Sequence, residues 1–236
     1  MVYNELNFWN EIGAKFIFSF TRNEGCDMQE DEILPILLDK SYLDDQKSKD
    51  IDPLVVGMAK AWDKTHALIS EAKDKMLAGE DGPFMDMTKF KDVYIALDPT
   101  LEYLELFENR ESYTFVDQLE YLKNQLFKVT DLRENIEVLF QFTLKAVGEE
   151  ALGELTFKFC SYVANAILIF KNHSPVISDR KDVNEEFMKL FMKLSVECAK
   201  TMPHEWNKLE TYKKLCDLCV SLSEEFLLYH PEYYAN

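Results

Sequence analysis

The chain has 236 residues, of which 47% are hydrophobic, and it contains only seven Gly and seven Pro. This much apolar material predicts a folded core and excludes intrinsic disorder, and the scarcity of turn residues and of period-two alternation favours an all-α protein. The formal net charge is −17, from 43 acidic and 26 basic residues. Such a charge repels phosphate backbones and anionic membrane surfaces, so we expect neither nucleic acid nor a membrane as a partner.

The cysteines indicate where in the cell the protein is found, and the lack of a linker indicates how many domains it has. Five cysteines at irregular spacing, with no secretory leader pattern, favour a reducing, cytoplasmic location. The most apolar run, residues 162–170, is too short to span a bilayer. No linker composition and no fixed-period repeat divides the chain, so we expect residues 1–236 to form one all-helical domain.

Apolar residues at spacings of three and four predict the helices of the first part of the chain. The first helix covers residues 3–20 and ends in a polar turn, and the second covers 28–46, with Pro35 near its first turn. Residues 47–52 are expected to form an exposed loop. Asp52 as cap and Pro53 as first residue predict a long helix over 53–77, which residues 79–83 end.

The second part of the chain is punctuated less strongly. A break is expected at Asp98 and Pro99 within residues 84–107, and a turn at 109–112. A helix follows from residue 113, and Asp131 with Glu134 predicts a reciprocal cap for the helix over 131–147. Further helices are predicted over 149–171, 181–200 and 203–229, which brings the total to about nine.

Catalytic and metal-binding patterns have little support in this sequence. Cys216 and Cys219 have the spacing of zinc and redox sites, but no second pair or close His accompanies them, so burial in the core is the preferred interpretation. Asp63, three residues before His66, is typical of a solvated helix face, and no phosphate-binding loop or nucleophile elbow occurs. We therefore expect no enzymatic activity, no catalytic residue, no metal and no cofactor.

The last predicted helix is similar to the closing helix of the 14-3-3 proteins. That family ends in a helix of the type YKDSTLIMQLLRDNLTLW, and residues 212–229 read YKKLCDLCVSLSEEFLLY, which aligns without a gap. Tyr212, Lys213, Leu222 and Leu228 are shared, and Tyr229 replaces the final Trp. Residues 121–134, YLKNQLFKVTDLRE, also resemble the family's YLKMKGDYYRYLAE, and residues 54–60, LVVGMAK, resemble LLSVAYK.

This resemblance implies a fold and a function. The fold is a cup-shaped bundle of about nine antiparallel helices with a concave groove, usually a dimer. The function is that of a signalling adaptor whose amphipathic groove clamps phosphoserine or phosphothreonine peptides of client proteins. The first helix lacks the family's usual dimer contacts, so Trp9, Phe16 and Phe20 are the candidates for an apolar homodimer contact.

The resemblance also assigns a peptide-binding set on the third, fifth, seventh and ninth helices, which it places around one cleft. The resemblance carries this set onto Lys60, Thr130, Asp131, Glu225 and, depending on the register, Phe157 or Lys158. Lys64, Lys128, Leu218 and Leu222 are added as neighbouring candidates for the same groove. Thr130 and Asp131 replace the family's phosphate-binding Arg-Tyr pair, and Glu225 replaces an Asn that holds the peptide backbone. The loss of these charge-assisted hydrogen bonds leaves the dependence on phosphate open.

Two alternatives stay open at this point. Lys128 and Lys158 either rebuild part of an anion site or pair with Asp131 and Glu225, and Lys60 with Lys64 is either a ligand-binding pair or a solvated helix face. The alternative function is that of a helical protein–protein interaction scaffold, unrelated to the 14-3-3 family and without a phosphopeptide site.

Overall fold

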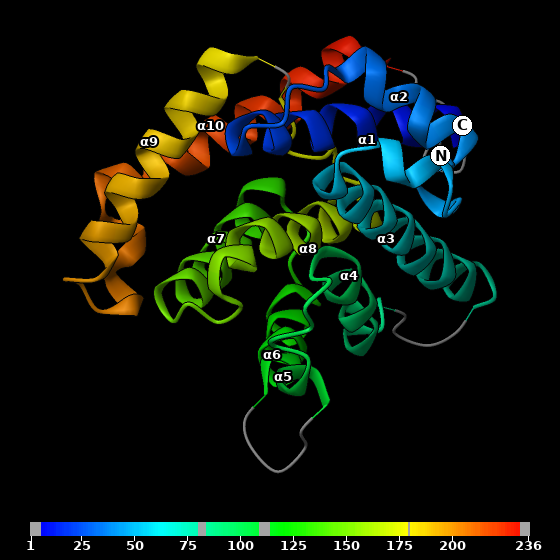
Figure 1. Ribbon diagram of the computed structural model, residues 1–236. Helices are drawn as coiled ribbons and strands as arrows, with labels where there is room; N and C mark the ends of the chain where they lie inside the picture. The colour runs from blue at the N-terminus through cyan, green and yellow to red at the C-terminus, as the bar shows by residue number, and fades with distance from the viewer. Residues whose placement is uncertain (1–5, 80–83, 109–113, 179, 232–236) are drawn as a thin grey trace.

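The computed structural model describes residues 6–79, 84–108, 114–178 and 180–231, and its regular elements are helices throughout (Figure 1). No residue in these ranges lies in a strand, so the predicted all-α class is confirmed. The α-helices are α1 (Leu6–Thr21), α2 (Glu30–Asp39), α3 (Pro53–Leu77), α4 (Phe90–Leu97), α5 (Glu105–Glu108), α6 (Phe115–Leu126), α7 (Leu132–Gly148), α8 (Thr156–Phe170), α9 (Lys181–Cys198) and α10 (Glu210–Tyr229). Short 3-10 turns lie between them: η2 (Arg22–Glu24), η3 (Ser41–Leu43), η4 (Lys47–Asp50), η5 (Met87–Lys89), η6 (Gly153–Leu155) and η7 (Pro203–Lys208).

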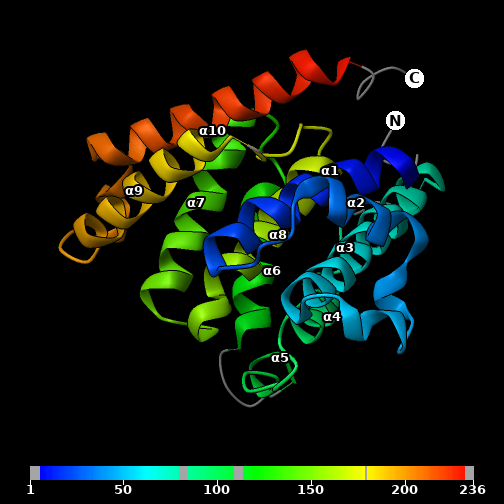
Figure 2. The same ribbon diagram turned by 45° about the horizontal axis from the view of Figure 1, so that its top comes forward.

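Helix α8 is the central element of the packing. It is apolar on nearly all sides, which is the pattern of a helix that is surrounded by others. It packs against α3, α4 and α7, while α1 packs on α2 and α3, and α10 packs on α7 and α9. In Figure 1, α1 and α10 cross above α7 and α8, and Figure 2 shows α9 and α10 side by side. The two ends of the fold meet where the ring of Phe8 lies 6.4 Å from that of Phe226.

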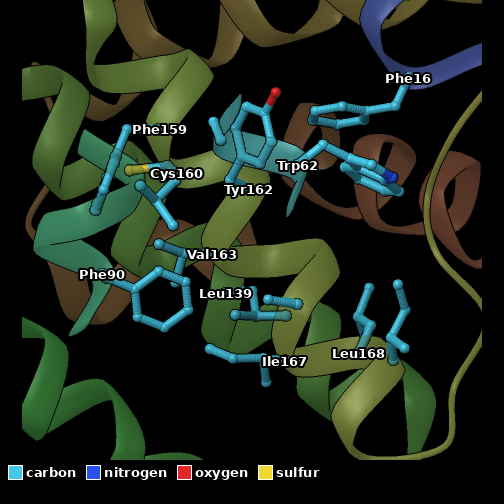
Figure 3. Close-up of a cluster of buried hydrophobic side chains, with 14 of the residues drawn as sticks. Phe16, Trp62, Phe90, Leu139, Phe159, Cys160, Tyr162, Val163, Ile167 and Leu168 are labelled. Carbon is cyan, nitrogen blue, oxygen red and sulfur yellow. The ribbon is translucent and has the colours of Figure 1, made fainter. Parts of the chain in front are cut away.

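Aromatic side chains bind α1 and α3 to α8 in the centre of the core. Trp62 stacks on Trp9 with ring centroids 4.4 Å apart and donates from Nε1 to the Trp9 carbonyl at 3.0 Å. Phe16 stacks on Trp62 and meets Tyr162 edge to face at 4.8 Å (Figure 3). The Tyr162 hydroxyl donates to the carbonyl of Met58 at 2.7 Å, which satisfies its one buried polar atom.

This packing overturns the expected dimer contact. Trp9 is 0% exposed and Phe16 is 2% exposed within one chain, so neither side chain is available to a second copy. The prediction was wrong for these two residues because their helix buries its aromatic face against α3 and α8. Phe20 is half-buried, and its ring lies 6.0 Å from that of Phe157.

Local capping signals located several helix starts correctly. The α3 bounds are those predicted, and the Asp52 carboxylate accepts from the Leu54 backbone N–H at 2.8 Å. The Asp131 carboxylate accepts from the Glu134 backbone N–H at 3.1 Å and opens α7. The predicted break at Asp98 is also confirmed, because its carboxylate accepts from the Thr100 backbone N–H at 2.9 Å and ends α4.

Three predictions in the first part of the chain were wrong. The second helix does not reach residue 46 but ends at Asp39, because Lys40 adopts a left-handed conformation with φ of 54°. In that position Lys40 pairs with Asp63 at 2.9 Å. Residues 47–52 are not a wholly exposed loop, since they include η4 and since Ile51 is buried in the core. Pro35 lies inside α2 rather than near its first turn.

Two later helices begin after their predicted starts. Helix α8 begins at Thr156 rather than 149, since Glu150 and Gly153 have φ of 50° and 55°, which no α-helix accommodates. The predicted helix over 203–229 is interrupted at Leu209, whose ψ of 135° separates η7 from α10. The turn predicted at 109–112, the start of the first helix at 3–5 and most of the stop at 79–83 lie outside the described residues.

Candidate functional site: an apolar pocket beside α8

A pocket of about 370 Å³ lies where α1, α7, α8, α9 and α10 meet. We call it the apolar pocket. Its walls are formed mainly by apolar side chains, among them Phe16, Phe20, Ile136, Leu139, Phe140, Phe157, Ala164, Leu168, Ile177, Phe187, Met188 and Leu222. Three further lining residues, Leu139, Cys160 and Leu168, belong to the cluster of buried side chains in Figure 3. The volume is within the range of roughly 300–1,000 Å³ that is usual for small-ligand sites.

The sequence of α8 explains why space is left here. Phe157, Ser161, Ala164 and Leu168 recur at spacings of four and three, so they lie on one face of the helix. The two middle members of this series have small side chains, whereas the members at either end are large. The small side chains leave room between α8 and α9, and Phe187 of α9 closes the far side, where its ring lies 6.1 Å from that of Phe157.

Three hydroxyl groups beside the apolar pocket are engaged within their own helices, whereas the hydroxyl oxygen of Ser178 accepts from the Arg180 backbone N–H at 3.2 Å. The hydroxyls of Ser19, Thr143 and Ser161 donate to the carbonyls of the residues three or four positions earlier, at 2.7, 2.9 and 2.9 Å. These groups therefore present satisfied oxygen atoms rather than free donors to a ligand. The pocket is suited to hydrocarbon groups.

Asn165 fixes the segment that closes one side of the pocket. Its amide nitrogen donates to the Ser161 carbonyl at 3.1 Å, and its amide oxygen accepts from the Val176 backbone N–H at 2.8 Å. Asn184 of α9 holds the same segment through a hydrogen bond to the Ser178 carbonyl at 2.9 Å. Residues 176–178 are thereby held between α8 and α9 and contribute Ile177 to the wall.

An ion pair between a buried lysine and an exposed glutamate lies at one edge of the apolar pocket. The side chain of Lys158 is only 7% exposed, and its ammonium lies 2.8 Å from the carboxylate of Glu24, which is itself a lining residue. This contact joins the start of α8 to η2. The charge of Lys158 is therefore already neutralised by an acidic partner.

A second cavity of about 410 Å³ adjoins the first and shares Ile177, Ser178 and Leu222 with it. We call it the polar vestibule. Its other lining residues are Lys15, Arg180, Glu225, Phe226, Tyr229 and His230. Arg180 Nη2 donates to the Glu225 carboxylate at 3.2 Å.

The structure brings together only part of the peptide-binding set predicted from the sequence. Leu222 lines both cavities, Glu225 lines the polar vestibule, and Lys158 is held at the edge of the apolar pocket through Glu24. In the described part of the chain, none of Lys60, Lys64, Lys128, Thr130, Asp131 and Leu218 lines either cavity, and neither α3 nor α6 contributes a lining residue.

The residues outside the site have other surroundings. Lys60 is half-buried and Lys64 exposed on α3, and Lys128 and Thr130 are exposed between α6 and α7. Asp131 caps α7. The alternative in which Lys158 and Glu225 take part in pairs among the predicted residues is wrong, because Lys158 pairs with Glu24 and Glu225 pairs with Arg180.

Sequence reasoning missed most of the lining residues. Phe187 and Met188 lie on a helix that was predicted but given no role, and Arg180 immediately precedes it. The signal that was present is Asn165, a polar residue inside the most apolar run of the chain. Because buried amides need hydrogen-bonding partners, such a residue indicates a contact with a non-helical segment.

The cysteine thiols are buried and are weaker acids than an exposed thiol. All five are buried and free, and burial raises the pKa of the Cys216 thiol to about 12 and that of Cys219 well above its usual range. Both members of the pair therefore stay protonated at neutral pH and pack in the core. In the ranges that the structure describes, His, Cys, Asp and Glu side chains form no group of three or more that could hold a metal ion.

Comparisons with family models, with curated proteins and with solved structures found no match to this chain. None of the described helices is long and apolar enough to cross a bilayer.

Proposed function

We propose that this chain is a non-enzymatic adaptor that binds segments of client proteins by taking their bulky apolar side chains into the apolar pocket. The observation that carries the proposal is the pocket itself, about 370 Å³ in volume and walled by apolar side chains of α1, α7, α8, α9 and α10. Aromatic and aliphatic anchors in desolvated pockets supply most of the affinity in such interactions.

A divergent 14-3-3-like adaptor is the specific form of this proposal. It rests on the similarity of residues 212–229 and 121–134 to the family and on the positions of Leu222, which lines both cavities, and Glu225, which lines the polar vestibule. A cup-shaped bundle, a homodimer and a cytoplasmic location belong to the same proposal. The dispersal of Lys60, Lys64 and Lys128 away from the pocket favours recognition without a phosphate group.

A helical interaction scaffold unrelated to that family is the second candidate. The observation in its favour is that the apolar pocket draws on α1 and α9 and takes no lining residue from α3 or α6. The 14-3-3 resemblance places the helices that correspond to α3 and α6 around the cleft. Both candidates bind proteins, and they differ in the part that phosphate plays.

Selection of peptides from a random phage-displayed library on the purified full chain tests the proposal. We expect selected peptides to share two or more bulky apolar residues and to bind Ala164→Phe about tenfold more weakly, because the new ring fills the pocket. Lys60→Glu is the matched control, since Lys60 lies on α3 outside the pocket and its replacement leaves binding unchanged.

The outcomes separate the candidates. A selection that yields no binding peptides overturns the adaptor proposal. Peptides whose affinity is lost in Lys60→Glu but kept in Ala164→Phe would move the site to α3. For each selected peptide that contains serine, a fluorescence anisotropy titration with the phosphorylated form supports the 14-3-3-like candidate if phosphate tightens binding and the unrelated scaffold if it does not.

A further inference from the structure

Helix α9 carries an apolar stripe that begins at the apolar pocket and continues on the surface. Met188, Met192 and Val196 follow one another at spacings of four, so their side chains lie on one face of the helix. Met188 lines the apolar pocket, whereas Met192 is 66% exposed and Val196 is 58% exposed. We call these three residues the methionine stripe. Figure 1 shows α9 at the outer edge of the fold, where a partner can reach it.

The methionine stripe differs from an isolated exposed side chain. Single apolar side chains are common on protein surfaces and need no partner. Here two exposed members are neighbours on one helix face, and the third lines a pocket. Methionine is flexible and polarisable, so it adapts to the apolar side chains of a partner. A client segment that is anchored in the apolar pocket can therefore also pack along the stripe.

Lysines border the methionine stripe, against the charge of the chain as a whole. Residues 187–202 contain Lys189, Lys193 and Lys200 and one carboxylate, Glu197, although the whole chain carries a net charge of −17. Lys193 pairs with Glu197 at 3.7 Å, whereas Lys189 and Lys200 make no ion pair with any described residue. Both of these lysines are exposed.

The other carboxylates of α9 lie nearer to its start. Asp182, Glu185 and Glu186 precede the methionine stripe, and Glu185 pairs with Lys181 at 3.7 Å. The surface beside the exposed part of the stripe is therefore positive. Acidic side chains of a partner that packs on the stripe would be attracted to it.

A partner on this surface has to satisfy its own backbone. The N–H and C=O groups of α9 bond to one another within the helix, and the Ser195 hydroxyl donates to the Phe191 carbonyl at 3.0 Å. An extended segment would find no main-chain partner along the stripe, whereas an α-helix makes its hydrogen bonds internally. An amphipathic helix also presents apolar side chains at spacings of three and four, as the stripe does.

We propose that the apolar pocket and the methionine stripe together bind an amphipathic client helix whose apolar face is flanked by acidic residues. One bulky apolar side chain of this helix enters the pocket, and those that follow pack on Met192 and Val196. Its carboxylates lie beside Lys189 and Lys200. The inference rests on the proposed adaptor function and specifies the chemistry of the client. A second copy of the chain fits less well, since two copies of α9 packed antiparallel about a two-fold axis bring their lysine flanks to the same side of the contact.

Fluorescence anisotropy of designed peptides with the full chain tests the proposal. The probe is a fluorescein-labelled peptide of about 16 residues, with phenylalanine and leucine at spacings of three and four, glutamate on one flank and alanine elsewhere. A second peptide has lysine in place of each glutamate, and a third has proline in place of one alanine on the outer face. We expect micromolar binding of the acidic peptide and at least about tenfold weaker binding of the other two. The net charge of −17 by itself predicts the opposite order for the acidic and the lysine peptide, so their order shows whether the lysine flank is the binding surface.

Reversal of the charge on the flank gives the sharpest variant. We expect Lys189→Glu combined with Lys200→Glu to weaken the acidic peptide about tenfold and to strengthen the lysine peptide, with a difference that shrinks at high salt. Lys64→Glu combined with Lys128→Glu changes the net charge by the same amount away from α9 and should leave both affinities within about twofold of wild type. All four lysines are exposed, so neither pair of substitutions disturbs the core.

A second variant tests the apolar part of the contact. Met192→Ser removes apolar surface from the exposed part of the stripe and should weaken the acidic peptide about fivefold. Met76→Ser is the matched control, because Met76 is 43% exposed near the end of α3, which contributes no residue to the apolar pocket. Its affinity for the acidic peptide should equal that of wild type.

Three results with the peptides would overturn the inference: equal or tighter binding of the lysine peptide, undiminished binding of the proline peptide, or no binding of the acidic peptide. A dimer in analytical ultracentrifugation that Met192→Ser dissociates would also overturn it, since the stripe would then bind a second copy. Failure here is distinguishable from failure of the adaptor proposal. Peptides from the phage-displayed library that lose affinity for Ala164→Phe but bind Met192→Ser as tightly as wild type would support the adaptor proposal and contradict this inference.

Discussion

The hydroxyl oxygens of Ser174 and Ser223 lie 2.8 Å apart in the core, and the two residues bind each other in both directions. Ser174 Oγ donates to the Ser223 carbonyl at 2.6 Å, and Ser223 Oγ donates to the Ser174 carbonyl at 2.9 Å. Both residues are buried. The pair joins α10 to the segment that carries Ile177 and Ser178, and these two residues line both the apolar pocket and the polar vestibule.

Removal of one hydroxyl from this pair should destabilise the protein. We expect Ser174→Ala to lower the free energy of unfolding by about 1–2 kcal/mol, because a buried carbonyl loses its partner in a site that water cannot reach. Urea denaturation followed by circular dichroism measures the change. Ser221→Ala, on an exposed face of α10, is the matched control and should stay within about 0.5 kcal/mol of wild type. Equal effects of the two substitutions would contradict a structural role for the pair.

Gly13 allows a close approach of α1 to the Trp62 ring of α3. A β-carbon at this position would overlap the indole ring of Trp62, which is itself held between Trp9 and Phe16. We therefore expect Gly13→Ala to destabilise the protein by roughly 1–3 kcal/mol, even though alanine favours the helix. Gly148→Ala is the control, because a β-carbon there meets no atom within 4 Å at the end of α7. Thermal unfolding that ranks the two variants the other way would contradict this packing.

Capping residues in the sequence predicted correctly those helix ends that depend on neighbouring residues alone. The bounds of α3 follow from Asp52 and Pro53, neighbours in the sequence that satisfy and preorganise its first turn. The break at Leu209 could not be predicted in this way. It brings Trp206 into the core, where its indole N–H donates to the Thr201 carbonyl at 3.1 Å, and that burial depends on tertiary packing.

The candidate site was less predictable than the helices for the same reason. Phe16, Phe140 and Phe187 each belong to an ordinary apolar helix face. The sequence of each helix alone does not predict that the three side chains line one pocket. Leu222 and Glu225 were predicted from the closing helix and do lie at the site. Their neighbours come from α1 and α9, which the residues compared with the 14-3-3 family do not include.

Removing Glu24 and removing Lys158 should change the free energy of unfolding by different amounts. Glu24→Gln leaves the ammonium of Lys158 buried without its carboxylate, and we expect a loss of about 1–2 kcal/mol, moderated by the partial exposure of Glu24. Lys158→Met removes the buried charge itself and should stay within about 1 kcal/mol of wild type. Urea denaturation compares the two variants. Glu210→Gln, whose partner Lys214 is exposed, is the control. A larger loss in Lys158→Met than in Glu24→Gln would contradict this account.

Lys73 makes the free energy of unfolding vary with pH in the alkaline range. Burial lowers the pKa of its ammonium from 10.5 to about 8, and the ammonium donates to Asn172 and lies 5.4 Å from the ring centroid of Phe170. Between these two values the unfolded chain binds more protons than the folded chain. The contribution of Lys73 to stability therefore rises with pH across this window and is lost as the pH falls towards 8.

Replacement of Lys73 by methionine should remove this dependence. Buried thiols such as Cys216 act in the opposite direction at alkaline pH, because burial raises their pKa, so the informative quantity is the difference between variant and wild type. We expect the stability advantage of Lys73→Met over wild type to shrink by on the order of 2 kcal/mol between about pH 8 and pH 9.5. Urea denaturation at the two pH values measures it, with Lys64→Met on the exposed face of α3 as control. A difference that is constant over this range would show that Lys73 keeps its proton in the folded protein.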